Sequence, residues 1–316
     1  MTTVVDKQRI QQILSSADQN ELLSYIEESF VAYSSLNAVV PPVGTLSFES
    51  PPGDVHIKYG YIQNQSHYVI KIASGFYNNP EIGLSSSNGL NLVFNQSNGV
   101  LETILLDEGL LTDVRTALAG AIAAKYLGPE TVHKIGIVGT GIQARLQLKY
   151  LSTVTDCTDV MVWGRTPENT KIYQREMNAL GYQTELVDDP ATLCNQCNLI
   201  VTTTPSTSPI LGCGAFTEDV LITAMGADTA GKQELEHSLL QKASLIVMDS
   251  ESQCTSHGEI HTAIKQGILE NIERLELGKI LVDRKFQRPS GLIIADLTGI
   301  ATQDIQISRF ILNALR

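Results

Sequence analysis

A glycine-rich turn between an apolar run and an amphipathic segment constrains the fold of this chain more than any other feature. The run Ile135–Val138 has the length and apolar character of a buried parallel strand. The next six residues fit G-x-G-x-x-A, in which the glycines permit a tight turn and a close approach to a pyrophosphate. A helix from about residue 143 would then point its free N–H groups at the phosphates. The predicted dinucleotide site comprises Gly139, Thr140, Gly141, Ile142, Gln143 and Ala144. The alternative is a glycine turn with a purely structural role.

The end of the next predicted strand, Asp159–Trp163, indicates which dinucleotide the site prefers. An NAD-preferring site carries an acidic residue there to bind the ribose 2′-hydroxyl. Positions 163–166 hold no acidic residue, and Arg165 offers a guanidinium that suits a 2′-phosphate. Thr166 adds a hydroxyl donor. We therefore predict NADP(H) as the preferred cofactor, with NAD(H) possible; a solvated loop arginine is the alternative.

Composition and charge limit the classes of protein to which this chain can belong. The chain has 316 residues, of which 43% are hydrophobic and 18% charged, so a globular protein with two domains is expected. A net charge of -12 argues against nucleic acid or an anionic membrane as a partner. The N-terminus has no basic segment followed by an apolar one, and no stretch approaches the length of a membrane span. A soluble cytoplasmic protein is the expectation.

The cysteines do not form a recognisable metal site. Cys194 and Cys197 are the only close pair, and a zinc site would need a second pair or histidines in register. Residues 257–261 contain two histidines but do not match H-E-x-x-H. We predict ordinary reduced thiols at 194 and 197 and no bound metal.

The N-terminal third predicts an antiparallel sheet with flanking helices. Residues 6–33 have helical periodicity, with Ser16 or Asp18 as the cap of a second helix. Residues 36–53 are rich in proline and glycine and are expected to be irregular. Strands are predicted over 55–62 and 68–74, and a hairpin over 91–106 around an Asn-Gly turn. A helix with Thr112 as its N-cap is predicted over 112–127.

The rest of the chain alternates between strands and helices, which predicts a doubly wound α/β (Rossmann) sheet. After 159–163, helices are expected over 168–180 and 191–197, and strands over 184–187, 199–203, 221–226, 245–248, 280–282 and 292–296. Because ligands bind beyond the carboxyl ends of such strands, three residues at strand ends are predicted cofactor contacts. They are Thr204, Met225 and Gly226. A helix over 303–316 is expected to return to the first domain, so the domains are 1–114 with 300–316, and 115–299.

Four blocks in this order and spacing resemble the ornithine cyclodeaminase/mu-crystallin family over nearly the whole chain. They are Val69–Ser74, Asp107–Ala117, the glycine turn Gly139–Ala144, and Met225–Leu235. The resemblance implies a nicotinamide-dependent enzyme with an α+β domain that binds substrate and forms a homodimer through its sheets. Known members include ornithine cyclodeaminase, an alanine dehydrogenase class and reductases of cyclic ketimines.

The resemblance also implies roles for individual residues. Lys71 and Arg115 match the cations that contact the substrate carboxylate, and Asp228 matches the aspartate of water activation or amine contact. The alternatives without a role in the site are an outward-facing Lys71, a surface charge at Arg115 and a turn-forming Asp228. Members often carry a further arginine where this chain has residues 41–45 without one, and Lys58 is a candidate replacement.

These features predict NADPH-dependent reduction of a small cyclic imino acid. Δ1-pyrroline-2-carboxylate would give L-proline, and Δ1-piperideine-2-carboxylate would give L-pipecolate. The alternatives are an ornithine cyclodeaminase, which forms proline and ammonia, and an amino acid dehydrogenase similar to alanine dehydrogenase. A third alternative is a mu-crystallin-type protein that binds NADPH without turnover.

Overall fold

The computed structural model describes residues 2–76, 78–212, 214, 216 and 218–315. The chain divides into two compact units, one formed by Met1–Arg115 with Ile300–Arg316 and the other by Thr116–Gly299. This division lies one residue from the predicted domain boundary. Each unit is described by itself.

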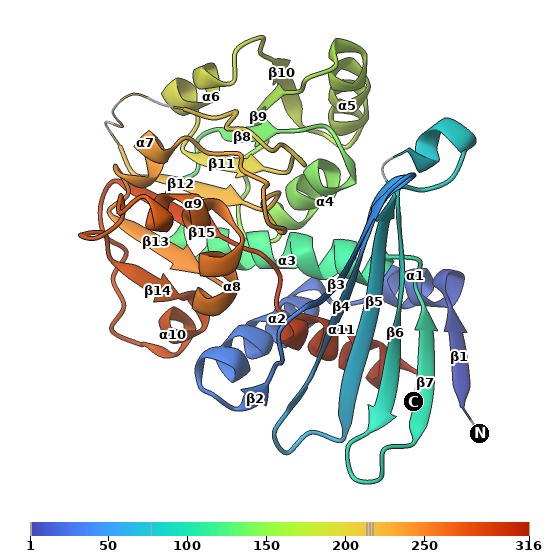
Figure 1. Ribbon diagram of the computed structural model, residues 1–316. Coiled ribbons are helices and arrows are strands. Elements are labelled where there is room, and N and C mark those ends of the chain that lie inside the picture. Colours follow the sequence, from blue (N-terminus) through green and yellow to red (C-terminus); the bar gives the residue numbers. More distant parts are fainter. Residues whose placement is uncertain (1, 77, 213, 215, 217, 316) are drawn as a thin grey trace. The chain divides into compact units, whose positions relative to one another are not determined.

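The first unit contains a seven-stranded sheet (Figure 1). Its order is β1-β7-β6-β5-β4-β2, with β3 also paired to β4. All pairs are antiparallel except β1 with β7, which is parallel. The predicted hairpin is present between β6 and β7, where Gly99 takes a φ of +74°. The strands are β1 Thr3–Asp6, β2 Ala38–Val39, β3 Gly44–Glu49, β4 Pro52–Ile62, β5 His67–Phe76, β6 Ser87–Asn95 and β7 Leu101–Leu106.

One prediction about this sheet is wrong, and one of its strands was missed. Residues 36–53 include β2 and β3, although an irregular segment was expected. Proline lacks an N–H group but is tolerated at the edge of a sheet, where that group would make no hydrogen bond to a neighbouring strand. The prolines on either side of β3 therefore do not prevent this strand from forming. The strand β1 was also missed, because four residues carry little periodic signal and its pairing partner lies about a hundred residues away.

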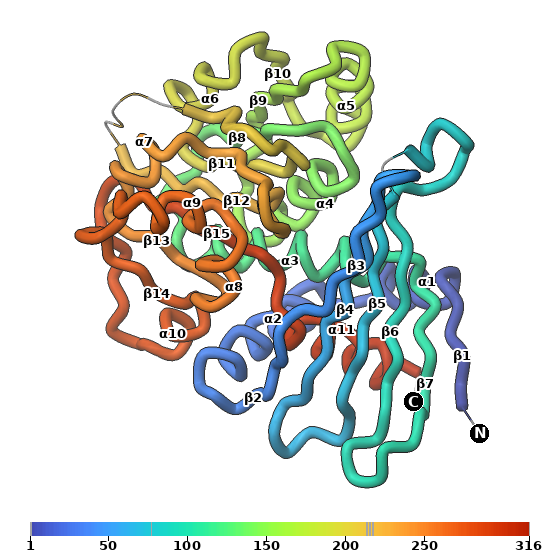
Figure 2. The backbone as a smooth tube through the Cα atoms, in the orientation of Figure 1, coloured from blue at the N-terminus to red at the C-terminus, as the bar shows by residue number. Residues whose placement is uncertain are grey.

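Helices α1, α2 and α11 cover one face of this sheet (Figure 1). They span Lys7–Ser16, Gln19–Ser34 and Ala301–Ala314. The Asp18 side chain accepts hydrogen bonds from the N–H groups of Asn20 and Glu21, so it is the cap that separates α1 from α2. The chain path shows the C-terminal helix, in red, returning to the N-terminal helices, in blue (Figure 2). The return of the last helix to the first domain is thus confirmed.

Helix α3, Leu110–Leu127, begins in the first unit and continues into the second. Thr112 lies inside the helix, so its prediction as the N-cap is wrong. Asp107 has the capping role instead, because its Oδ2 accepts a hydrogen bond of 2.8 Å from the N–H of Leu111. An aspartate separated from the helical run by Glu108 and Gly109 gives a weaker local signal than a threonine within it.

The second unit is built on an eight-stranded sheet in the order β10-β9-β8-β11-β12-β15-β13-β14 (Figure 1). Every pair is parallel, which confirms the predicted doubly wound α/β fold. The strand order reverses between β8 and β11, which is where such sheets bind ligands. The strands are β8 Ile135–Val138, β9 Asp159–Trp163, β10 Gln183–Leu186, β11 Leu199–Thr202, β12 Val220–Ala224, β13 Leu245–Met248, β14 Arg274–Glu276 and β15 Leu292–Asp296.

The helices of the second unit lie between successive strands, except that no helix among the described residues separates β11 from β12. The predicted strand over 280–282 is wrong: this segment belongs to α10, and the strand lies just before it as β14. Three apolar residues do not distinguish a short strand from a helical turn. The helices are α4 Ile142–Leu151, α5 Pro167–Ala179, α6 Ala191–Gln196, α7 His237–Leu240, α8 Glu251–Ser256, α9 Glu259–Lys265 and α10 Leu277–Val282.

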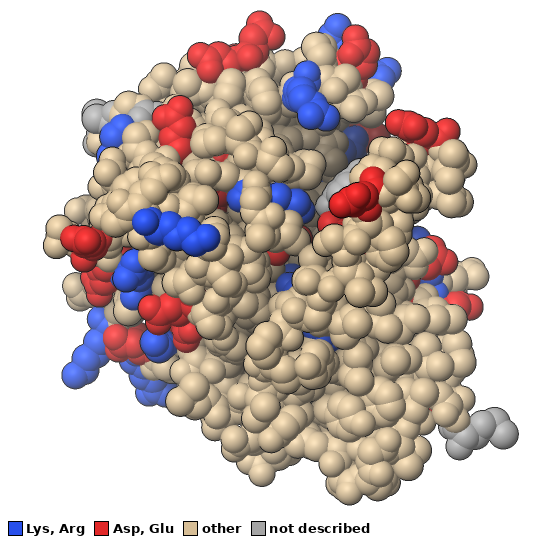
Figure 3. Space-filling view, viewed as in Figure 1, with Lys and Arg blue, Asp and Glu red and all other residues tan. Residues whose placement is uncertain are grey.

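The outer face of the first unit's sheet, away from its helices, carries few charges (Figure 3). Strand alternation places Tyr59, Tyr61, Ile70 and Ile72 on this face, and Tyr68 stacks on Phe94 across β5 and β6 at a ring distance of 4.9 Å. Separately, none of the described helices is long and apolar enough to cross a membrane.

Candidate active site

Lys71 lies on the helix-covered face of the first unit's sheet. Its neighbours Ile70 and Ile72 are partly exposed on the opposite face, whereas Lys71 itself is only 3% exposed. The alternation of β5 therefore places the lysine inward, beneath α11. The alternative of an outward-facing lysine is excluded.

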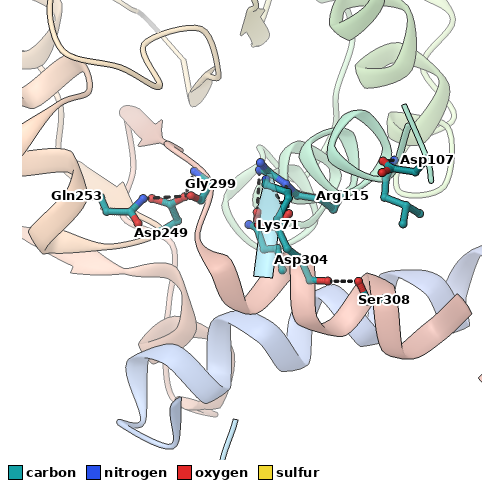
Figure 4. Close-up of polar contacts among 10 residues, drawn as sticks. Lys71, Asp107, Arg115, Asp249, Gln253, Gly299, Asp304 and Ser308 are labelled. Carbon is teal, nitrogen blue, oxygen red and sulfur yellow. Dashed lines mark hydrogen bonds and ion pairs between the residues drawn. The ribbon is translucent and has the colours of Figure 1, made fainter. Parts of the chain in front are cut away.

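Lys71 and Arg115 converge on one carboxylate, Asp304 (Figure 4). Lys71 Nζ lies 2.9 Å from Asp304 Oδ1, and Arg115 Nε lies 3.2 Å from the same oxygen. Arg115 Nη1 also donates to Gln303 Oε1 at 3.0 Å. All three charged side chains are buried, so Arg115 is not a helix-surface charge. Sequence analysis predicted the two cations but missed Asp304 and Gln303.

Burial and mutual attraction shift the pKa values of this cluster. Loss of hydration lowers the pKa of Lys71 to about 7, and Asp304 opposes this shift only in part. Burial disfavours the ionised Asp304, but Lys71, Arg115 and Lys58 outweigh that effect and lower the pKa of its carboxyl group. Asp304 is therefore a carboxylate at neutral pH, while Lys71 can gain or lose its proton there.

Lys58 contributes a further buried cation to the same face. It lies on β4 directly opposite Lys71, and it is buried. Its charge contributes to the lowered pKa of Lys71. Residues 41–45 hold no arginine, and Lys58 on β4 is a buried cation on this part of the sheet.

Several buried polar atoms beside this cluster have no hydrogen-bond partner among the described residues. They include Asp304 Oδ2, Gln303 Nε2 and Asn91 Oδ1. Asn91 pairs with Lys71 in the β5–β6 register, so both side chains lie on one face. A buried polar atom left unpaired costs roughly 1–3 kcal/mol, so these groups are suited to bind a polar ligand. Cations beside open acceptors suit a small molecule that has a carboxylate and an N–H group.

In the second unit, the glycine turn follows β8 as predicted. Gly139 takes a φ of +115°, and a Cβ atom there would lie 2.7 Å from Thr203 Oγ1. A Cβ atom at Gly141 would have nothing within 4 Å. The first glycine is thus required by backbone conformation and packing. The second leaves open space beside the backbone, as a pyrophosphate would need.

The N-terminus of α4 has the features of a phosphate-binding helix end. Gly141 is its N-cap and provides no side-chain hydrogen bond to the free N–H groups. Arg145, which sequence analysis missed, donates from Nη1 to the carbonyl oxygens of Thr140 and Gly141. It also donates from Nε to Glu176 at 2.6 Å. Arg145 therefore fixes the turn through its carbonyl groups.

Arg165 and Thr166 follow β9 beside this turn. The N–H of Gly139 donates to the carbonyl oxygen of Trp163 at 2.9 Å, which brings the two loops together. Arg165 is exposed, as a residue that meets a solvent-facing 2′-phosphate can be. Thr166 is the N-cap of α5, and its hydroxyl makes no capping bond.

The residues at the ends of β11 and β12 lie together. Thr204 and Gly226 both donate backbone N–H groups to the Glu234 carboxylate, and Met225 donates its N–H to the Thr202 carbonyl. Sequence analysis placed Thr204, Met225 and Gly226 at this edge but missed Glu234. Glu234 lies in a largely polar segment between Gln233 and Leu235, so its sequence context gave no signal of a buried carboxylate.

Asp228 lies in the loop after β12, where ligands bind in such sheets. Its carboxylate is about half exposed and forms an ion pair of 2.7 Å with Lys232. Gly231 takes a φ of +88°, so the segment does form a turn, as the interpretation of Asp228 as a turn-forming residue predicts. The same position at a strand end also suits a role in the site.

One prediction about the cysteines is wrong. Cys194 is disulfide-bonded, whereas Cys197 is a buried free thiol. Because Cys194 and Cys197 have no second pair and no histidines in register, the sequence indicated only that they do not form a zinc site. Across the described residues, no group of three or more His, Cys, Asp and Glu side chains could hold a metal ion.

Comparisons with known proteins show what this chain is similar to. The model of the ornithine cyclodeaminase/mu-crystallin family matches residues 2–316. An uncharacterised cyclodeaminase of Sinorhizobium fredii is 36% identical and covers 89% of this chain and 87% of its own. The Δ1-pyrroline-2-carboxylate reductase of Bacillus cereus is 26% identical, with coverage of 93% and 91%. An archaeal alanine dehydrogenase dimer, solved with bound NAD, has a TM-score of 0.87 at 27% identity, with coverage of 99% and 95%.

The family match extends over nearly the whole chain and includes both compact units. The chain belongs to the ornithine cyclodeaminase/mu-crystallin family.

Proposed function

We propose that this protein is an NADPH-dependent reductase of a small cyclic imino acid. The substrate class is Δ1-pyrroline-2-carboxylate, reduced to L-proline, with the six-membered Δ1-piperideine-2-carboxylate as a further substrate. The observation that carries the proposal is the buried group of Lys71, Arg115 and Asp304, which is suited to an α-imino carboxylate. The reductase of Bacillus cereus supports it as a relative with that activity.

The first unit supplies the binding of the carboxylate. Arg115 presents a planar guanidinium that can grip a carboxylate with two parallel hydrogen bonds. Asp304 and Gln303 hold this guanidinium in place before substrate arrives. Lys71 adds a second cation from strand β5. A pre-oriented pair of donors lowers the entropic cost of placing the α-carbon for reaction.

The nitrogen of the substrate needs a proton, because a cyclic imine accepts hydride best as an iminium ion. Lys71 is the proposed donor, since burial lowers its pKa to about 7 and it can release a proton near neutral pH. Asp228 is proposed to contact the nitrogen or stabilise its charge. The hydride itself is the chemistry that the nicotinamide supplies when bound, and the residues of the glycine turn fit its pyrophosphate.

The assay follows NADPH absorbance with Δ1-pyrroline-2-carboxylate and purified protein. We expect NADPH to be consumed and L-proline to form. Formation of proline and ammonia from ornithine with catalytic NAD would favour the cyclodeaminase instead. Turnover of pyruvate with ammonia would favour an alanine dehydrogenase, and tight NADPH binding without any turnover would favour a mu-crystallin-type binding protein.

The preference for NADPH is proposed from Arg165, although the archaeal structural relative holds NAD. Replacing Arg165 by aspartate should shift the ratio of kcat/KM from NADPH toward NADH by about 10- to 100-fold, because it exchanges a phosphate-binding cation for a ribose-binding acid. The measurement is steady-state kinetics with both cofactors at a fixed imino acid concentration. Replacement of Arg175, on the neighbouring helix α5, is the control and should leave the ratio unchanged. An unchanged ratio in the Arg165 variant would remove that residue from the site.

The outer face of the first unit's sheet, which carries few charges, is the proposed homodimer interface. Introducing lysine at both Tyr61 and Ile70 should convert a dimer into a monomer, because two buried cations oppose burial of an apolar face. Light scattering coupled to gel filtration measures the mass. Leu180→Lys is the control, since Leu180 is exposed on the second unit, and its mass should match the unmodified protein. A dimer that survives the double substitution would place the interface elsewhere.

A further inference from the structure

The Glu234 carboxylate joins the loops that follow two neighbouring strands. Its Oε1 accepts hydrogen bonds from the N–H of Thr204 at 2.5 Å and from the Thr204 hydroxyl at 2.8 Å. Its Oε2 accepts from the Thr202 hydroxyl at 2.6 Å and from the N–H of Gly226 at 2.8 Å. The side chain is completely buried. One carboxylate therefore holds the carboxyl ends of both β11 and β12.

The arrangement requires an acceptor at both oxygen positions. Each oxygen faces one backbone N–H group, and a backbone N–H cannot turn away or reverse its role. A glutamine in the same place would direct its NH2 group at the N–H of either Thr204 or Gly226, whichever way the amide is turned. The threonine hydroxyls can rotate to adapt, but the two backbone donors cannot. Only a carboxyl group satisfies the pair.

Glu234 is itself fixed in place by a second buried acid. Glu259 accepts hydrogen bonds from the N–H of Glu234 at 2.7 Å and of Leu235 at 2.9 Å. The carbonyl oxygen of Glu234 accepts from the N–H groups of Ile210 and Leu211. Burial raises the pKa of the Glu234 carboxyl group, and its donors from Thr202, Thr204 and Gly226 oppose that shift. The residue is thus rigid at backbone and side chain.

The loops that Glu234 holds belong to one half of the dinucleotide fold. The N–H of Thr203 donates to the carbonyl oxygen of Val138, directly before the glycine turn. The segment from Gly226 to Glu234, which contains Asp228, is closed by the bond from Gly226 to the carboxylate. In a doubly wound sheet, the strands beyond the reversal of order form the mononucleotide-binding half opposite the adenosine half. Here those strands are β11 and β12.

We propose that Glu234 is a positioning residue that sets the nicotinamide half of the cofactor site by holding the loops after β11 and β12 in one geometry. This inference rests on the proposed binding of a nicotinamide dinucleotide. It does not assign Glu234 any contact with the cofactor. The adenosine half, at the glycine turn and β9, has its own contacts from Arg145 and from Gly139 to Trp163, so we expect it to depend far less on Glu234 than the nicotinamide half does.

The test compares two ligands on Glu234→Gln. NADPH spans both halves of the site, whereas 2′-phospho-ADP-ribose lacks the nicotinamide. We expect the Kd for NADPH, measured by calorimetry, to rise about tenfold or more, because the amide leaves a buried backbone donor unpaired. The Kd for 2′-phospho-ADP-ribose should stay within about twofold of the unmodified protein, because the adenosine half is unaffected. Glu236→Gln is the matched control, an exposed glutamate two residues away, and should change neither Kd.

Each outcome bears on the inference. Equal loss of affinity for both ligands would show a general defect of the domain and overturn it, as would unchanged affinity for NADPH. Thr202→Val removes one hydroxyl donor and keeps both backbone contacts, so it provides a milder test if Glu234→Gln does not fold. It should weaken NADPH binding about threefold while sparing the fragment; equal effects on both ligands would again overturn the inference. If the unmodified protein binds neither ligand, the proposed function fails as well, whereas intact binding with an unresponsive Glu234→Gln rejects this inference alone.

Discussion

Replacement of Arg115 by methionine is expected to lower kcat/KM for the imino acid by about two to three orders of magnitude, mostly through KM. The guanidinium is buried and held by Asp304 at 3.2 Å, so the cation is pre-oriented for a carboxylate. Methionine fills much of the space but offers neither charge nor hydrogen bonds. A substrate carboxylate would then be buried with one cation fewer, and breaking a buried ion pair costs roughly 3–5 kcal/mol.

A surface cation of the same unit is the control for Arg115. Lys7 is partly exposed and pairs with Glu108, so Lys7→Met should leave kcat/KM unchanged within about twofold. Circular dichroism and thermal unfolding of both variants separate a lost contact from a lost fold. If Arg115→Met remains folded and KM rises less than about fivefold, Arg115 does not bind the substrate carboxylate.

Lys71 should give the second large effect, which is best seen as a pH profile. Because burial lowers the pKa of Lys71 to about 7, the lysine is mostly protonated below pH 7 and loses its charge as the pH rises through that value. If the protonated form binds the carboxylate and supplies the proton, kcat/KM should fall about tenfold per pH unit on the alkaline side. Lys71→Met should lower kcat/KM by about 10³-fold at pH 6 and remove this limb.

Asp304→Asn provides the check on this assignment. Asp304 raises the pKa of Lys71, so its neutralisation should move the alkaline limb toward lower pH. If the pH profile of kcat/KM keeps its alkaline limb in Lys71→Met, a group other than Lys71 is responsible for that limb. A limb that moves to higher pH in Asp304→Asn would contradict an ion pair that raises the pKa of Lys71.

The local parts of the fold could be predicted from the sequence. The turn at Gly139 was predictable because the conformation and the packing that require glycine are set by a few neighbouring residues. The hairpin at Gly99 was predictable for the same reason, since Asn-Gly determines such a turn by itself. Alternation in β5 limited Lys71 to one of two faces, and only packing against α11 decided between them.

Features that depend on distant partners could not be predicted. The bond of Lys71 to Asp304 joins residues 233 positions apart, and nothing near Asp304 marks it as the partner of a cation. The four-residue β1 becomes a strand only by pairing with β7. The segment at 280–282 was too short for its hydrophobic periodicity to distinguish a strand from a helix.

Short-range patterns in the sequence encode the dinucleotide-binding turn and the two-domain order of the chain, whereas the cations of the site were indicated by the resemblance to a family. Tertiary structure alone decided which groups meet those residues. Burial beneath α11 gives Lys71 a titration near neutral pH, and Glu234 becomes a shared acceptor only when the ends of β11 and β12 lie side by side. The charge state and the rigidity of a site depend on hydration and hydrogen-bond geometry, which exist only once remote segments have packed together.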